Sequence, residues 1–111
     1  MIREQHLTRR DQFSSVYACG KSWANEVLVM KALPNELKLS RFGFSINRRV
    51  GKAVVRNRLK RRLRECVQSV IWKPGWDVVF IARSAASATD YRRLKESVER
   101  LNRRARLNEA G

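Results

Sequence analysis

The sequence has little of what secreted, membrane-spanning or zinc-binding proteins need. Its 111 residues include two cysteines and one histidine. Cys19 and Cys66 form no CxxC pair, and together with His6 they supply too few ligands for a four-coordinate zinc site. No apolar stretch approaches the roughly 18 residues that a membrane span needs, and the N-terminus lacks the apolar segment of a secretory signal. We therefore expect reduced thiols in a cytoplasmic protein.

Acidic residues are also scarce. The chain has 10 Asp and Glu against 25 Lys and Arg, which gives a formal net charge of +15. An apolar fraction of 43% excludes a wholly disordered basic tail. The length predicts a single domain, 1–111, because a second core would not fit. Within it we expect the ends, 1–6 and 107–111, to be mobile.

The positive charge is concentrated in one segment. Residues 37–64 contain 11 basic side chains and no acidic one. Such a field attracts polyanions, and arginine, which dominates the segment, binds phosphate through two parallel hydrogen bonds. The alternative is a solvated charged surface without a binding partner, but such surfaces usually mix charges of both signs. The segment therefore predicts a nucleic-acid partner.

The spacing of apolar residues predicts an α+β fold, a small α/β sandwich of helices packed on a sheet. The element order is α-β-β-(β)-α-β-α, and the bracketed strand forms only if the second apolar run breaks near Ser40. The first two strands are expected to pair as an antiparallel hairpin. The expected elements are a helix over 9–18, strands over 26–33 and 37–47, a helix over 54–70, a strand over 78–82 that is buried on both faces, and a last helix that Asp90 caps.

The helix over 54–70 combines an apolar stripe with cations. Arg56, Lys60 and Arg64 are spaced i, i+4, i+8 and line one edge of it, while Arg58, Arg61 and Arg62 widen that edge. A rigid basic surface of this kind suits a folded RNA, which proteins recognise largely by shape and backbone contacts. Asn57 either hydrogen-bonds a 2′-hydroxyl or base edge, or satisfies local backbone; the sequence leaves both open. The apolar stripe consists of Val55, Leu59, Leu63, Cys66, Val67 and Val70.

The segment 48–61, RRVGKAVVRNRLKR, followed by Arg64 one turn later, resembles the RNR signature of the protein subunit of bacterial ribonuclease P. The resemblance covers about residues 7–105. Residues 7–20 are similar to the family's first helix, 41–45 to its central strand and 77–83 to its last strand. The resemblance implies that the strand–helix–strand crossover is left-handed, whereas such crossovers are usually right-handed.

The resemblance implies a function as well. In that family a large RNA is the catalyst, and the small protein binds both this RNA and the 5′ leader of precursor tRNA, which the holoenzyme removes. Mg²⁺ is held by the RNA active site, and neither DNA nor membrane is an expected partner. The residues implied to bind the catalytic RNA are Arg56, Asn57, Arg58, Lys60, Arg61 and Arg64. Those implied for the leader cleft are Phe13, Tyr17, Lys31, Arg48, Arg49 and Lys52.

The two aromatics of the first helix have two readings. Phe13 and Tyr17 are spaced i, i+4, which is typical of core residues, whereas the resemblance implies that they line the leader cleft. Aromatic rings accept any base by stacking, so they suit leaders of varied sequence. Lys31 stands where the family often has an aromatic on the first strand. A cation there would contact a leader phosphate instead of stacking.

Three other functions compete with this one. An independent nuclease is disfavoured, because the sequence has neither paired carboxylates for two-metal hydrolysis nor a positioned nucleophile–base pair. A ribosomal-type structural RNA-binding protein explains the charge but not the RNR spacing. A DNA-binding helix is weaker still, since no dimerisation surface or base-reading pattern is evident.

Overall fold

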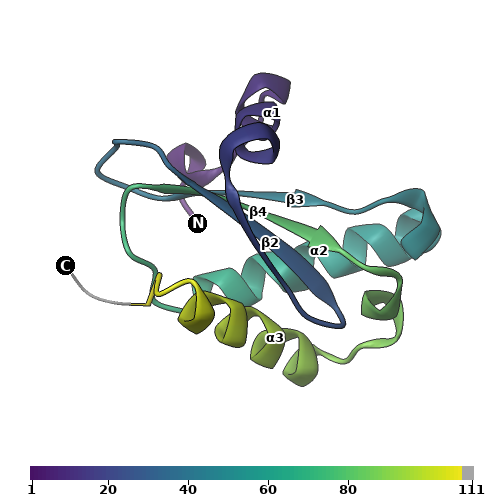
Figure 1. The fold of residues 1–111 in the computed structure, drawn as a ribbon. Helices are drawn as coiled ribbons and strands as arrows, with labels where there is room; N and C mark the ends of the chain where they lie inside the picture. Colours follow the sequence, from purple (N-terminus) through teal and green to yellow (C-terminus); the bar gives the residue numbers. More distant parts are fainter. Residues whose placement is uncertain (109–111) are drawn as a thin grey trace.

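A four-stranded sheet lies at the centre of the structure, a computed structural model that describes residues 1–108 (Figure 1). The strand order is β1-β2-β4-β3. β1 pairs with β2 and β2 pairs with β4 in antiparallel orientation, whereas β3 and β4 are parallel. β4 therefore lies inside the sheet, and its buried residues agree with the predicted strand that is covered on both faces. The strands are β1 (Lys21–Ala24), β2 (Leu28–Pro34), β3 (Arg41–Ser45) and β4 (Trp76–Ala82).

Helices cover both faces of this sheet. α2 and α3 lie against one face and α1 packs on the other, as Figure 1 shows. The α+β class and the order α-β-β-β-α-β-α are confirmed. The helices are α1 (Arg10–Cys19), α2 (Ala53–Gln68) and α3 (Tyr91–Arg104), with short 3-10 turns η1 (Arg3–Gln5), η2 (Arg48–Val50) and η3 (Ser84–Ala88).

The predicted hairpin between the second and third apolar runs is wrong. β2 forms its hairpin with β1, which the sequence did not reveal, and β3 pairs with β4 instead. β1 is short, mostly exposed and lacks apolar alternation, so it carries little strand signal. Its turn is set by Asn25, whose Oδ1 accepts hydrogen bonds from the backbone N–H of Val27 at 3.1 Å and Leu28 at 2.9 Å. The extra strand thus precedes β2, and no break near Ser40 creates it.

The connection β3–α2–β4 joins two neighbouring parallel strands. In Figure 1 both strands run to the right, α2 returns beneath the sheet, and β4 lies nearer the viewer than β3. This arrangement makes the crossover left-handed, as the resemblance implies. It also places the start of α2, with its cations, next to the carboxyl end of β3.

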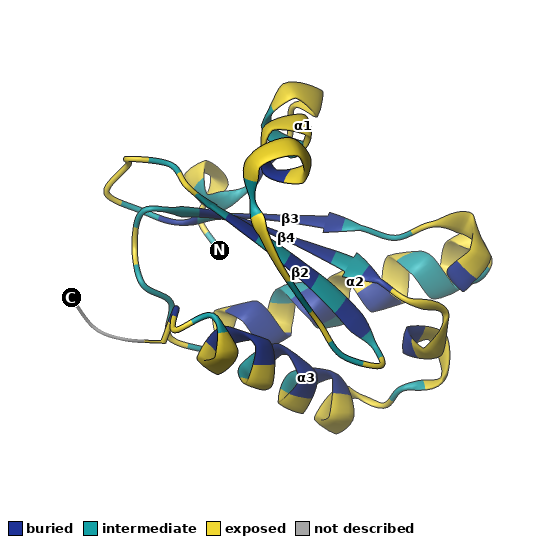
Figure 2. Cartoon of the chain, in the orientation of Figure 1, coloured by how far each residue is buried: buried dark blue, intermediate teal, exposed yellow. Residues whose placement is uncertain are grey.

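The main core lies between the sheet and the pair α2 and α3 (Figure 2). Four members of the predicted α2 stripe are buried, and Val55 and Val70 are half-buried. Burial raises the pKa of the Cys66 thiol to about 11, so this cysteine stays protonated as an apolar core residue. The packing fixes α2 from Leu59 to Val67. The largest core side chains include Leu28, Met30, Leu63, Val67, Val78, Phe80, Leu94, Val98 and Leu101.

The helix ends differ in how they are capped. Asp90 caps α3 as predicted, because its carboxylate accepts the backbone N–H of Arg93 at 2.8 Å. At α1, Thr8 makes no side-chain cap. Instead the amide oxygen of Gln12 accepts the N–H groups of Thr8 and Arg9, each at 2.9 Å. The first turn of α1 is therefore closed from inside the helix.

The chain ends make defined contacts. His6 pairs with Phe42 at the β3 edge, and Leu7 donates its N–H to the Phe42 carbonyl at 2.9 Å. Leu107 is buried, and its carbonyl accepts the N–H of Lys73. The mobility expected for 1–6 and 107–111 stays a prediction, and within it 109–111 lie outside the described residues.

Candidate nucleic-acid interface

The predicted RNA-binding residues of α2 lie on the side of the helix that the core leaves open. Leu59 and Leu63 are buried against the sheet and α3, which holds the helix rigidly. We call the six predicted RNA-binding residues of this helix, from Arg56 to Arg64, the α2 basic face. Four of them, Asn57, Arg58, Lys60 and Arg61, are exposed, and two, Arg56 and Arg64, are half-buried.

No ion pair among the described residues neutralises the α2 basic face. Within residues 1–108 the ion pairs are Arg9–Asp11, Arg92–Glu96 and Arg41–Asp77. The first two are exposed and lie on other helices. The cations of α2 therefore lack carboxylate partners in the described part of the chain and can bind an external anion.

The two half-buried arginines differ in their surroundings. Arg56 donates from Nε to the carbonyl oxygen of Gly51 at 3.1 Å, which ties the turn before α2 to the helix. The Nε of Arg64 is buried, and no hydrogen-bond partner for it lies among the described residues. The Nε atoms of these two guanidinium groups are therefore not available to an external ligand.

One cation of the basic segment serves the fold instead. Arg41 forms two hydrogen bonds with Asp77, from Nε at 2.8 Å and from an outer nitrogen at 2.7 Å. Asn35 donates to the same carboxylate at 2.9 Å. Hydrogen bonding to Asp77 raises the pKa of the Arg41 guanidinium. Arg41 is thus removed from the field that residues 37–64 present to a partner.

The second candidate surface lies between α1 and the sheet. The ring of Phe13 rests on Gly43, where an added Cβ would come within 2.6 Å of the ring, so only glycine fits there. Phe13 also packs with Leu7 and Val16 in a small core cluster. Tyr17, whose ring centroid is 6.4 Å from that of Phe13, remains 41% exposed. Phe13 is therefore partly a core residue, and Tyr17 is the accessible aromatic.

The strand register places Lys31 on the same face as α1. Lys31 pairs with Ser22 on one side and with Val79 on the other, and Val79 packs under α1. Side chains of paired residues point to the same face of a sheet. Phe13, Tyr17 and Lys31 thus share one face, as the resemblance requires of a cleft.

The remaining predicted cleft residues lie at the border between this face and α2. Arg48 and Arg49 form η2 directly after β3, and Lys52 is the N-cap of α2. All three are exposed. Asn47 fixes the turn by accepting the N–H of Arg49 at 2.9 Å. They form a basic edge that joins the α1 side of the sheet to the α2 basic face.

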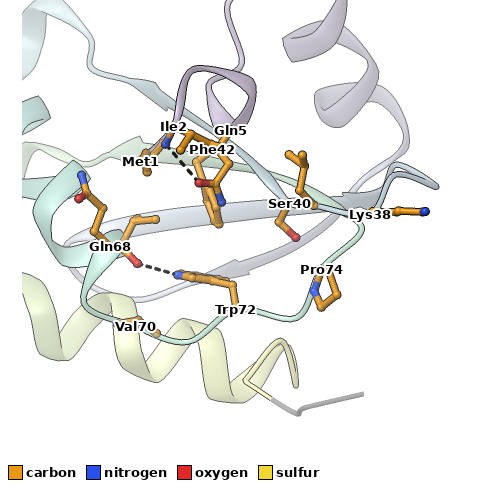
Figure 3. Close-up of a pocket in the computed structure, with 12 residues that line it drawn as sticks. Met1, Ile2, Gln5, Lys38, Ser40, Phe42, Gln68, Val70, Trp72 and Pro74 are labelled. Carbon is orange, nitrogen blue, oxygen red and sulfur yellow. Dashed lines mark hydrogen bonds between the residues drawn. The ribbon is translucent and has the colours of Figure 1, made fainter.

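Sequence reasoning missed a hollow at the other end of α2. It has a volume of about 690 Å³ and is lined in part by Phe42, Gln68 and Trp72 (Figure 3). Its residues come from the N-terminus, the segment 38–42, the end of α2 and the loop that follows. No local pattern could have brought these segments together.

Within residues 1–108, no three side chains of the His, Cys, Asp and Glu types lie close enough together to hold a metal ion. The helices of that same region are all too short or too polar to cross a membrane.

Comparisons with known proteins point to one protein family. The model of the family described as Ribonuclease P matches residues 1–106. The ribonuclease P protein component of Dehalococcoides mccartyi strain 195 is 43% identical over 107 residues, which cover 96% of this chain and 89% of that protein. That of Caldanaerobacter subterraneus is 41% identical and covers 93% of this chain and 90% of that protein.

Solved structures share the fold of this chain. The RNase P protein of Staphylococcus aureus superposes with a TM-score of 0.86 at 28% identity, covering 95% of this chain and 98% of that one. The RNase P protein of Thermotoga maritima gives 0.81 at 34% identity, covering 89% and 96%.

Proposed function

The chain belongs to the ribonuclease P protein family, and from that premise we propose that it is the protein component of a holoenzyme that removes the 5′ leader of precursor tRNA. In this proposal the α2 basic face binds the catalytic RNA. The observation that carries it is the absence of carboxylate partners for that face within residues 1–108. When cations on a rigid support neutralise phosphates, the RNA releases its condensed counterions, which favours binding.

The leader of the precursor would bind on the α1 side of the sheet. Tyr17 offers a ring on which a base can stack, and Lys31 offers a cation for a phosphate of the same strand. The basic edge of Arg48, Arg49 and Lys52 would follow the leader toward the catalytic RNA. Neither aromatic stacking nor phosphate contacts read sequence, so leaders of many sequences can bind.

Catalysis would belong to the RNA subunit. We propose that the endonucleolytic hydrolysis uses Mg²⁺ bound in the RNA, as membership of this family implies. The protein lowers the repulsion between two polyanions by placing cations between them. We place the complex in the cytoplasm, where the thiols of Cys19 and Cys66 stay reduced.

Reconstitution tests the proposed function. The protein is combined with a bacterial ribonuclease P RNA at low Mg²⁺, and cleavage of a precursor tRNA is followed. We expect cleavage at the mature 5′ end with the protein and little without it. RNA binding without any gain in cleavage would contradict the proposal and would favour a structural RNA-binding protein. The protein without RNA is the control for a contaminating nuclease.

Replacing Tyr17 by alanine is expected to weaken binding of precursor tRNA to the holoenzyme by roughly 5- to 150-fold, the loss of one stacked base. Binding of mature tRNA, which has no leader, should be unchanged. Because Tyr17 is 41% exposed, the fold should tolerate the change. The matched control is Ser14→Ala, an exposed position on the same helix. Equal losses for precursor and mature tRNA would remove Tyr17 from the leader surface.

A further inference from the structure

The hollow at the C-terminal end of α2 has no assigned role in the function proposed above. Its volume of about 690 Å³ falls within the range of small-ligand sites. In Figure 3 the indole of Trp72 is seen on edge below Phe42, with Met1, Ile2 and Gln5 above and Gln68 to one side. Trp72 is held in place because its Nε1 donates to the carbonyl of Val67 at 3.0 Å. The hollow therefore has a fixed aromatic floor and an open side.

The chemistry of the lining suits a nucleotide. Trp72, which is half-buried, supplies aromatic surface, Gln5 and Gln68 supply amides, and Lys38 supplies a cation; none of the lining residues is acidic. A nucleobase has a flat apolar face and a polar edge that amides can hydrogen-bond, and its phosphate needs a cation. An apolar peptide would leave the amides and the lysine unused.

The hollow continues the α2 basic face. Arg56, Lys60, Arg64 and Gln68 are spaced i, i+4, i+8, i+12 and thus follow one side of α2. A smaller hollow of about 310 Å³ lies at the other end of this line, between the carboxyl end of β3 and the first turns of α2. Both hollows are bounded by β3, which is an edge strand of the sheet, and by α2. An RNA bound along the line of cations would reach Gln68 and the larger hollow.

We propose that the hollow receives one unpaired base of the catalytic RNA, with Gln68 at the base edge and Lys38 on the adjacent phosphate. The inference rests on the proposed function, because the RNA that binds the α2 basic face supplies the base. It adds to that function a contact that recognises a single-stranded position, which a line of phosphate contacts alone does not provide. A second copy of the chain is a poorer occupant, because two molecules of charge +15 repel each other.

Site-directed crosslinking tests the proposal. Gln68 is exchanged for cysteine in a Cys19→Ser background, which leaves the buried Cys66 as the other thiol, and a photoreactive group is attached to position 68. Glu65→Cys is the matched control, since it is exposed on the same helix one turn earlier but lies at a different angle around it. The labelled protein is assembled with catalytic RNA and precursor tRNA, and crosslinked nucleotides are mapped.

We expect position 68 to crosslink to one unpaired nucleotide of the catalytic RNA, and position 65 to give no crosslink there. Crosslinks to paired nucleotides only, to the precursor, or equally from both positions would overturn the inference. If the Cys19→Ser holoenzyme assembles and cleaves precursor but position 68 gives no crosslink, the inference fails while the proposed function stands. If the holoenzyme does not assemble, both fail.

A second measurement uses Gln68→Ala. We expect the affinity for catalytic RNA to fall about three- to tenfold, the loss of one hydrogen bond to the base edge. Substitution of the crosslinked nucleotide by an abasic one should then cost less affinity in this variant than with the unaltered protein, because the contact between Gln68 and the base is already absent. Independent losses from the two changes would contradict contact between them.

Discussion

Replacing Arg61 and Arg64 together by alanine is expected to weaken binding of the catalytic RNA by about a hundredfold or more. Each charge-assisted hydrogen bond to phosphate contributes about 1.5–3 kcal/mol, and a tenfold change in affinity corresponds to about 1.4 kcal/mol. Neither arginine has a carboxylate partner within residues 1–108. The loss therefore reflects contacts to RNA and no broken internal pair.

The salt dependence gives this prediction its sharper readout. Each lost phosphate contact lowers the slope of log affinity against log salt by about 0.7–0.9, so the double variant should lose about 1.4–1.8. Arg93→Ala with Arg100→Ala is the matched control, because it removes the same charge from exposed positions of α3. An unchanged slope for the α2 variant, or an equal change for both, would exclude these two side chains from the RNA contact. Thermal melting of the free protein shows whether either variant is misfolded.

The exchange of Asp77 for alanine is expected to lower the free energy of unfolding by about 3–5 kcal/mol, the usual cost of removing one partner of a buried ion pair. Asp77 accepts three hydrogen bonds, two from Arg41 and one from Asn35. The side chain of Arg41 is 23% exposed, so water cannot replace all of them. Urea unfolding of the single variant measures the loss.

A double variant separates the cost of leaving Arg41 unpaired from the cost of altered packing around Asp77. With both Asp77 and Arg41 exchanged for leucine, no unpaired charge remains, and we expect a smaller loss than for Asp77→Ala alone. Asp90→Ala is the control for an exposed carboxylate, with an expected loss of about 1 kcal/mol from the α3 cap. Equal losses for Asp77→Ala and Asp90→Ala would show that the ion pair contributes little.

The helices and the central strand were predictable because their signals are local. The stripe from Leu59 to Val67 repeats at helical spacing, and the run from Val78 to Ala82 is apolar throughout, so burial followed directly from the pattern. The cations of α2 could be placed on the open side of the helix for the same reason.

The sheet order and the hollow could not be predicted in this way. β1 is held by the turn at Asn25 and by pairing with β2, and its own four residues show no alternation. The pairing of β3 with β4 depends on residues about 35 positions apart, such as Phe42 and Val78. The hollow unites four segments, and the partnership of Arg41 with Asp77 likewise required the tertiary structure. Long-range contacts of this kind leave no periodic trace in the sequence.

The interior position of β4 has a consequence for the order in which the protein can form. β2 and β3 do not touch each other through the backbone, and both depend on β4, which is the last strand to be synthesised. A growing chain can form the β1–β2 hairpin and α2 early, but its sheet closes only after residue 82 has left the ribosome. Until then the arginine-rich helix has no complete sheet on which to pack its apolar stripe. A nascent fragment that stops short of β4 will therefore expose its cations and its apolar stripe together, and will be a substrate for chaperones and proteases.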